Sequence, residues 1–373
     1  MNQSKKIRRT IKNSKRSLWL LRKIKNVLME SESSLQPFDL TALIGVRIRI
    51  SMSFRLRFRF FVTIMILFTV HTEAQEKKPE REPLVMRFAG ESRSLSLNLS
   101  DQTPEGLIPV SYEPNTPFLA GLGLNYGDFG FMVDFKVPGI DKDTSRYGTT
   151  RAQDLQGYYY AERVGVDLFY QNYSGFYADY PNGKTDNSIA DIRSDLRVTN
   201  LGTNVYFSLT DSFSLKPAFR QAGWQDGFHL GFLLGASANA FMVSSSTTII
   251  PATLEARFPQ YTGYRGGQYL NLSVMPGLGL SYADKGAFFI TVILMLGGGA
   301  THATIDVNAG SSTTVTDNFK GNAKINLGAR TESLVVGIAM IADFTGVSAF
   351  SGSTFQLGAG LALFNVYASY AIY

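Results

Sequence analysis

The sequence predicts an all-β protein, a transmembrane antiparallel up-and-down β-barrel of about 12 strands, within a range of roughly 10 to 14. Three observations lead to this fold class. A secretion signal begins near residue 52, no run of roughly 18 apolar residues follows residue 90, and the chain beyond it alternates in polarity from one residue to the next. The pattern favours membrane-crossing strands over membrane-crossing helices.

Segments of about 9 to 14 residues carry bulky apolar side chains on one face and small or polar ones on the other. Successive side chains of a strand point to opposite faces, so each segment has one face for lipid and one for water. Soluble strands are usually roughly 5 or 6 residues long, whereas a tilted strand needs about 10 to cross a bilayer. We therefore expect Leu234 and Leu272 to face lipid, and Asn239 and Asn271 to face the lumen.

Eleven strands are predicted after Pro117, at 118–126, 129–137, 158–170, 196–209, 212–221, 228–243, 269–282, 287–299, 319–329, 332–342 and 355–373. Residues 107–112 supply a twelfth, which places both chain ends on the same side, as in bacterial barrels. Residues 95–99 also alternate, and either extend the sheet edge or cross the mouth of the barrel. The alternation slips near Leu363 and Phe364, which we interpret as a bulge.

Residues 52–74 have the order of a secretory signal peptide. Three arginines precede an apolar run at 60–70, and Thr72 and Ala74 are small residues at the −3 and −1 positions of a cut after Ala74. A helix needs roughly 20 residues to span hydrocarbon, so this shorter run predicts a cleaved signal rather than a retained anchor.

Residues 1–51 form a basic extension, which we interpret as lying upstream of the true start at Met52. The alternative is a genuine extension with a short amphipathic helix. We assign residues 75–92 to an N-terminal linker and 93–373 to an outer-membrane β-barrel, so the predicted location is the outer membrane of a Gram-negative-type envelope.

Charge is distributed unevenly along the chain. Residues 1–74 hold 15 of the 36 Lys and Arg and 4 of the 30 Asp and Glu, which leaves 21 basic and 26 acidic groups after residue 74. A mildly acidic body lacks the basic surface of a nucleic-acid-binding protein. The absence of cysteine excludes a disulfide scaffold, and no histidine or carboxylate spacing indicates a metal, so we predict no cofactor. The predicted partners are outer-membrane lipid and, during insertion, the barrel-assembly machinery; the oligomeric state is left open.

Several charged or titratable residues fall on the polar faces and are predicted to face the lumen. Unpaired charge in a dry barrel is costly, so these groups either pair and plug the lumen or line a hydrated pore. The predicted lumen residues are Asp134, Lys136, Arg163, Asp167, Lys216, Arg220, His229, Lys320, Lys324 and Arg330.

Short stretches resemble domain-of-unknown-function family 4421 of bacterial outer-membrane β-barrel proteins. They are Tyr112-Glu113-Pro114-Asn115, Gly121-Leu122-Gly123, residues 204–208, residues 211–215 and Trp224-Gln225-Asp226. The resemblance covers roughly residues 90–373 and implies a barrel. It carries over no catalytic residues.

Two functions remain open at this level. The first is a small pore or a plugged structural barrel, and the alternative is a surface adhesin or ligand-binding barrel that acts through the loops 138–157, 171–195 and 244–268. A barrel hydrolase is a third reading, in which His229 would pair with Ser237 or Ser208, but a lone lumen histidine is usually a hydrogen-bonding filler. We predict no catalytic residues and no enzymatic activity.

Overall fold

The computed structural model describes residues 82–373 except 104–105, 117, 180–190, 221–224, 259–261, 285–287, 308–309 and 349–355. The predicted extension, the predicted signal peptide and residues 75–81 of the predicted linker lie outside the described residues. The two helices described, α4 (Thr144–Tyr147) and α5 (Leu215–Arg220), are each too short to cross a membrane.

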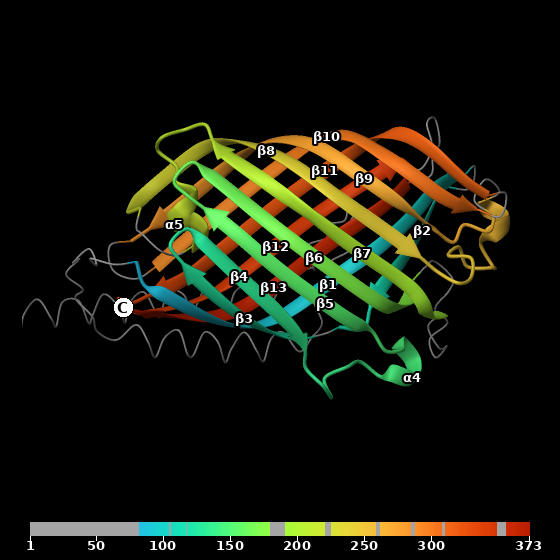
Figure 1. Ribbon diagram of the computed structural model, residues 1–373, viewed down its shortest axis with the longest axis horizontal. Helices are drawn as coiled ribbons and strands as arrows, with labels where there is room; N and C mark the ends of the chain where they lie inside the picture. Colours follow the sequence, from blue (N-terminus) through green and yellow to red (C-terminus); the bar gives the residue numbers. More distant parts are fainter. Residues whose placement is uncertain are drawn as a thin grey trace, which may run out of the picture. The chain divides into compact units, whose positions relative to one another are not determined.

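The described residues form thirteen antiparallel strands in a single closed sheet, which confirms the predicted barrel (Figure 1). The ring of 12 runs from β1 through β3 to β13, and β13 pairs with β1. The strands are β1 (Leu84–Thr103), β2 (Gly106–Pro114), β3 (Leu119–Tyr126), β4 (Phe129–Lys136), β5 (Arg151–Tyr160), β6 (Val164–Asp179), β7 (Asp191–Ser208), β8 (Gly227–Ser244), β9 (Gly266–Ala283), β10 (Phe288–Val307), β11 (Gly310–Arg330), β12 (Leu334–Ser348) and β13 (Gln356–Ile372).

The two ends of the barrel are distinguished by their connections. Leu84 pairs with Ile372, so the first and last strands meet at one end, which we call the terminal end. Short turns such as Gly127-Asp128 lie there, together with one long connection, 209–226. The opposite, loop end carries the longer connections 137–150 and 245–265.

The ring narrows toward the loop end. β1 pairs with β3 from Val85 to Glu91 and with β2 from Leu97 to Thr103, so β2 and β3 follow one another along the same edge of β1. At the loop end β2 pairs directly with β6, which bypasses the β4–β5 hairpin. The described strands therefore form a ring of 12 near the terminal end and a ring of 10 near the loop end.

Two strand predictions and the linker assignment were wrong. Residues 158–170 span the β5–β6 turn at 161–163, a turn without glycine or proline to mark it. Residues 212–221 contain α5, where Pro217 is tolerated in the first turn and the apolar spacing reflects burial of Phe213 and Leu215. Residues 84–92 belong to β1, not to a linker, and 95–103 continue that strand.

Part-way along the barrel, β1 changes from apolar side chains outside and polar ones inside to the reverse arrangement. In the terminal half, β1 turns Phe88 outward (52% exposed) and Arg93 inward (2% exposed). In the loop half the same strand carries serine and asparagine at its outward positions and buries Leu95, Leu97 and Leu99 inside. On β1 the terminal half thus has the polarity of a membrane barrel and the loop half that of a water-soluble barrel, whereas on β8 and β9 the apolar residues Met242 and Leu270 remain exposed on the outside beside the buried core residues Val243 and Tyr269.

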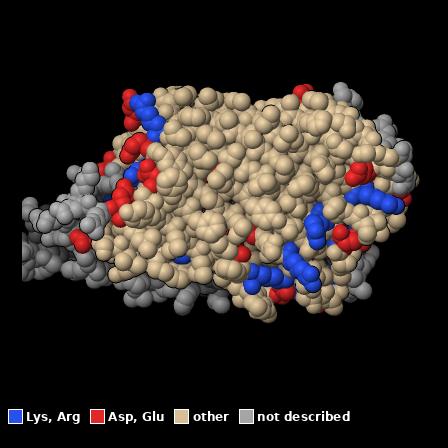
Figure 2. Space-filling model, in the orientation of Figure 1, with Lys and Arg blue, Asp and Glu red and all other residues tan. Residues whose placement is uncertain are grey.

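β13 undergoes the same exchange, which corrects the predicted bulge. Its pairing with β1 and β12 is continuous through Leu363 and Phe364. Leu357 points inward into the apolar core of the loop half, Leu363 points inward at the level of Arg93, and Tyr370 points outward from the terminal half. The slip in the sequence pattern is therefore a change of environment on a regular strand. Figure 2 shows the matching surface, with charged side chains toward both ends and a broad uncharged band between them.

Candidate functional site

The loop half of the lumen is filled by an apolar core. Inward side chains of β1, β2, β6 to β10, β12 and β13 meet there, together with residues from the β8–β9 connection. We call this connection, residues 245–265, the loop plug; its buried members include Ile249, Ile250, Leu254, Phe258 and Tyr264. Because these side chains pack against the wall from inside, the lumen has a hydrophobic core at this level.

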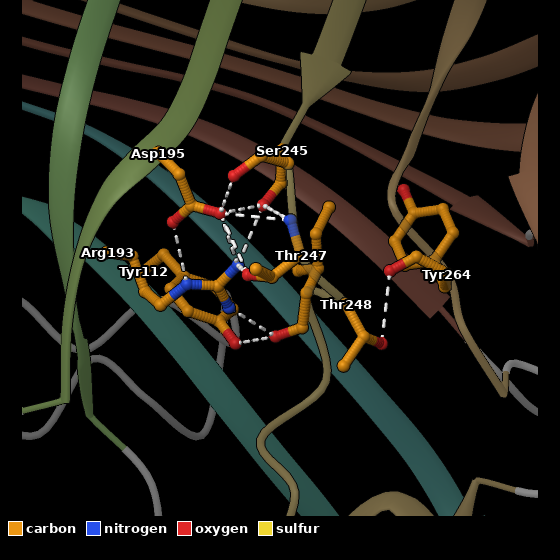
Figure 3. A network of polar contacts seen from close by, with 9 residues as sticks. Tyr112, Arg193, Asp195, Ser245, Thr247, Thr248 and Tyr264 are labelled. Atoms are coloured by element: carbon orange, nitrogen blue, oxygen red, sulfur yellow. Dashed lines mark hydrogen bonds and ion pairs between the residues drawn. The ribbon is translucent and has the colours of Figure 1, made fainter.

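A polar latch fastens the loop plug to β7 (Figure 3). The Arg193 guanidinium binds the Asp195 carboxylate (Nε–Oδ1 3.1 Å) and donates to the Ser245 hydroxyl at 2.7 Å and to the Ile249 carbonyl at 3.1 Å. Asp195 in turn accepts from the Thr247 hydroxyl at 2.9 Å. Charge-assisted bonds of this kind hold the plug backbone where the strands alone do not reach it.

Tyr112 completes the latch from β2, which is separated from β7 by β6 alone. Its hydroxyl, on β2, donates to the same Ile249 carbonyl that receives the Arg193 bond. The Arg193 guanidinium also lies 5.9 Å from the centre of the Tyr112 ring. The plug backbone at Ile249 is therefore held from two strands, β2 and β7.

A second plug closes the terminal end. Residues 209–226, which include α5, bury Phe213 and Leu215 against the lumen face of β8 and β9; we call this segment the terminal plug. Phe213 occupies a socket made by two glycines: a Cβ atom on Gly231 would lie 2.4 Å from the Phe213 Cβ, and one on Gly279 2.6 Å from its ring. Glycine is required at both positions for the phenylalanine to enter.

An ion pair network anchors the terminal plug to the barrel rim. The Lys216 ammonium binds Asp128 at 2.8 Å and Glu82 at 3.0 Å. The hydrogen bond to Asp128 raises the pKa of Lys216, so this lysine stays charged.

Between the plugs lies a polar layer with two ion pairs. Lys324 contacts Asp167, which also accepts from the Tyr206 hydroxyl at 2.8 Å. Lys320 contacts Asp343, whose other oxygen accepts from the Asn322 amide at 2.8 Å. A cavity of about 70 Å³ lies among these groups. The Lys324–Asp167 pair joins β11 to β6 across the lumen, and the Lys320–Asp343 pair joins the neighbouring strands β11 and β12.

A buried arginine lies where the ring changes from 12 strands to 10. Arg93, on β1 between its β3-paired and β2-paired parts, contacts Glu91 at 2.8 Å and Asp134 at 2.9 Å, and also contacts Asp154. Loss of the arginine would leave three buried carboxylates without their shared cation, so the branch depends on it.

Asn115 bridges the branch where no strand ladder does. Its amide donates to the Gly148 carbonyl at 2.7 Å, and its backbone N–H donates to the Thr150 hydroxyl at 2.7 Å. Thr150 in turn donates to the carbonyl of Gly175, a residue with φ of +83° in the bulge of β6. Side chains therefore supply the backbone hydrogen bonds that the split between β2 and β3 removes.

Comparison with known proteins identifies the family. The model of a domain of unknown function, DUF4421, matches residues 75–370. The chain belongs to the DUF4421 family. No curated protein matches the DUF4421 chain.

Solved structures similar to the DUF4421 chain are outer-membrane barrels. The outer membrane protease OmpT from Escherichia coli is 11% identical, with 81% of this chain and 100% of that chain covered and a TM-score of 0.32. The transport unit of the autotransporter AIDA-I from Escherichia coli is 13% identical, with 83% and 97% covered and a TM-score of 0.31. The COG4313 outer membrane channel from Pseudomonas putida F1 is 8% identical, with 81% and 100% covered and a TM-score of 0.30.

Four of the predicted lumen residues lie together in the lumen of the DUF4421 barrel. Asp167, Lys320 and Lys324 belong to the polar layer, and Asp134 belongs to the Arg93 cluster. Lys136 shares the inward phase of Asp134 but lies at the end of β4, where it binds the loop residue Asp141 at 3.0 Å.

The other predicted lumen residues lie at the terminal end. Arg163 is outside the lumen, 61% exposed in the β5–β6 turn and paired with Asp211. Lys216 and Arg220 lie on α5 rather than on a strand. His229 and Arg330 lie at the terminal ends of β8 and β11, where the His229 ring bonds to the Asp226 carbonyl. Strand assignments that ran through a turn or through α5 caused the misplacement of Arg163, Lys216 and Arg220.

Sequence reasoning missed several functional groups of the DUF4421 barrel. Arg93 and Glu91 were missed because β1 was not recognised as a full strand. Asp154, Arg193, Asp195 and Asp343 fell in segments taken for loops. The available signal was the inverted alternation of β1, with leucine at its inward positions from 95 to 99.

Proposed function

We propose that the protein is an outer-membrane β-barrel that is closed at rest and that displays its loop half at the cell surface. The hydrophobic core across the loop half of the lumen carries this proposal. Ion conduction needs a hydrated path, and an apolar core removes it. The terminal plug and the paired charges of the polar layer block the same path twice more.

The orientation is inferred from the chain ends and from most of the connections; the long connection 209–226 at the terminal end is the exception, and it folds into the lumen as the terminal plug. Bacterial barrels keep short turns and both chain ends in the periplasm and extend longer loops outward. The terminal half supplies the apolar outer surface for the bilayer, at residues such as Leu272, Leu294 and Phe232. The loop half, with a packed interior and polar outward positions on strands such as β1, then stands in water outside the cell.

A surface binding barrel is the second candidate. The loop plug is fixed by the latch, and the 137–150 connection is held against the wall by Asn115 and by Lys142, which donates to the Tyr177 hydroxyl at 2.9 Å. A rigid, ordered surface binds a partner at a lower entropic cost than a mobile one. This observation favours binding over transport for the loop half.

Conductance in planar bilayers tests the closed state. The wild-type barrel should give no steady conductance, and a variant with residues 246–263 replaced by a short Gly-Ser linker together with Phe213→Ala should conduct. A single Arg193→Met variant should raise the frequency of brief openings, because it removes the latch while leaving the plug in place. Folding is checked by the heat-dependent migration of intact barrels on gels. Steady conductance of the folded wild type would overturn the proposal.

A further inference from the structure

Outward-facing basic side chains are confined to one sector of the barrel wall. Among the described strand residues, only Arg151 on β5 and Arg197 on β7 combine a positive charge with an outward position; the other lysines and arginines of the strands take inward phases. Arg197 lies between Leu196 and Val198, which are buried in the lumen. Because successive side chains of a strand point to opposite faces, the Arg197 side chain points outward. Both arginines are exposed.

The two arginines flank a single residue of β6. Arg151 pairs with Ser174, and Ser174 pairs with Arg197. Neighbouring strands lie about 4.8 Å apart, so the two Cα atoms are about 10 Å apart, within reach of one anion for two side chains of this length. Neither guanidinium contacts a carboxylate of the described residues.

Two further sets of paired residues from β5, β6 and β7, which we call rungs, extend this sector toward the terminal end. The next rung aligns the neutral polar residues Gln153, Asn172 and Thr199, and the Thr199 hydroxyl donates to the Asn172 side chain at 3.2 Å. The rung after it aligns the outward apolar residues Leu155, Tyr170 and Leu201. Charged, neutral polar and apolar groups therefore follow one another down the wall in the order in which a phosphorylated lipid presents them.

We propose that this sector, Arg151, Ser174 and Arg197 above Gln153, Asn172 and Thr199, binds the phosphate of an anionic lipid of the outer leaflet. An arginine guanidinium can donate two parallel hydrogen bonds to phosphate oxygens, and Ser174, between the two arginines, offers a hydroxyl donor. The acyl chains lie along Leu155, Tyr170 and Leu201. The inference rests on the proposed orientation, in which the loop end faces outward, because only then does the sector meet the outer leaflet.

The experiment measures lipid retained by the folded barrel. Barrels purified in detergent are incubated with bis-phosphorylated lipid A, and bound lipid is counted by native mass spectrometry. Arg151→Gln with Arg197→Gln should lower retention about tenfold, since two basic side chains near a charged lipid surface are removed. The double lysine variant should recover only part of it, because lysine keeps the charge and loses the fork. Arg265→Gln, an exposed arginine of the loop plug, is the matched control and should leave retention unchanged.

The outcomes separate the possible sources of the phosphate. Retention of lipid A that exceeds that of its dephosphorylated form, and that millimolar inorganic phosphate does not displace, supports the proposal. Equal retention of both forms would show that acyl chains alone bind, and displacement by inorganic phosphate would show a free-phosphate site; either result overturns it. Failure of the orientation shows separately, as a loop-plug epitope that antibody cannot reach on intact cells although the purified barrel still retains lipid.

Discussion

The Lys324 ammonium on β11 contacts the Asp167 carboxylate on β6 across the lumen, although 157 residues separate them in the chain. The Lys324 side chain is 7% exposed and that of Asp167 20%. Asp167 also accepts bonds from Tyr160 and Tyr206, so the pair is the centre of a polar network rather than an isolated contact.

Removal of one partner of this pair should destabilise the barrel strongly. Lys324→Met leaves the Asp167 charge buried, and we expect a loss of about 3 to 5 kcal/mol in the free energy of unfolding. Asp167→Asn combined with Lys324→Met should cost less than the sum of the single changes, because neither charge then remains uncompensated. Urea unfolding from lipid vesicles measures all three. Additive effects would show that the two charges do not interact.

The socket formed by Gly231 and Gly279 predicts that a larger residue in place of a glycine is tolerated better when the side chain at position 213 is small. Gly231→Ala places a methyl group on the Phe213 side chain and should cost about 1 to 3 kcal/mol by overpacking. In a Phe213→Ala background the same change should cost much less, because the clash is gone. Gly346→Ala is the control, since nothing lies within 4 Å of a Cβ atom there. An equal cost of Gly231→Ala in both backgrounds would place Phe213 outside the socket.

The barrel and its outward faces could be predicted because strand alternation is local. Leu272 points outward and Asn271 inward, as their spacing required. The Arg93 cluster could not be predicted in the same way: its carboxylates come from β1, β4 and β5, and only the register brings them together. α5 was missed because residues buried in a plug can imitate the period of a strand.

Export should remove the chain up to Ala74, because a basic region, an apolar run and small residues precede that position in the required order. The family match begins at residue 75. N-terminal sequencing of the membrane-extracted protein should therefore read from Gln75. Ala74→Arg should cause the uncut precursor to accumulate, since the −1 position needs a small side chain. A mature protein that starts at Met1 would refute both the signal and the late start.

Asn271 on β9 lies in a packed part of the lumen, so the cost of substituting it can be compared with the cost of substituting its outward neighbour Leu272. Leu272 is 57% exposed, whereas Asn271 is 1% exposed. The side-chain oxygen of Asn271 accepts a hydrogen bond from the Thr301 hydroxyl at 2.5 Å. Leu272→Arg should cost about 2 to 4 kcal/mol if it faces lipid near the midplane. Asn271→Arg should cost at least as much, because the larger side chain has no room and a buried partner is lost. Folding into vesicles measures both, and a tolerated Asn271→Arg would indicate a wet, open lumen.

The exchange of polarity along β1 gives the sharpest test of where the membrane ends. Phe88 faces outward in the terminal half, and Asn98 faces outward in the loop half on the same strand. Phe88→Arg should cost up to about 2 to 4 kcal/mol, depending on its depth in lipid, whereas Asn98→Arg should change stability by less than about 0.5 kcal/mol because that face meets water.

Leu97, next to Asn98, gives the opposite contrast. It is fully buried in the core of the loop half, so Leu97→Arg should prevent folding or cost more than any outward change nearby. Spectroscopic depth probes attached at positions 88 and 98 through introduced cysteines locate lipid independently of stability, since the chain contains no other cysteine. Lipid contact at position 98 equal to that at position 88 would mean that the bilayer covers the whole barrel. The leucine core would then need an explanation other than a water-exposed outer half.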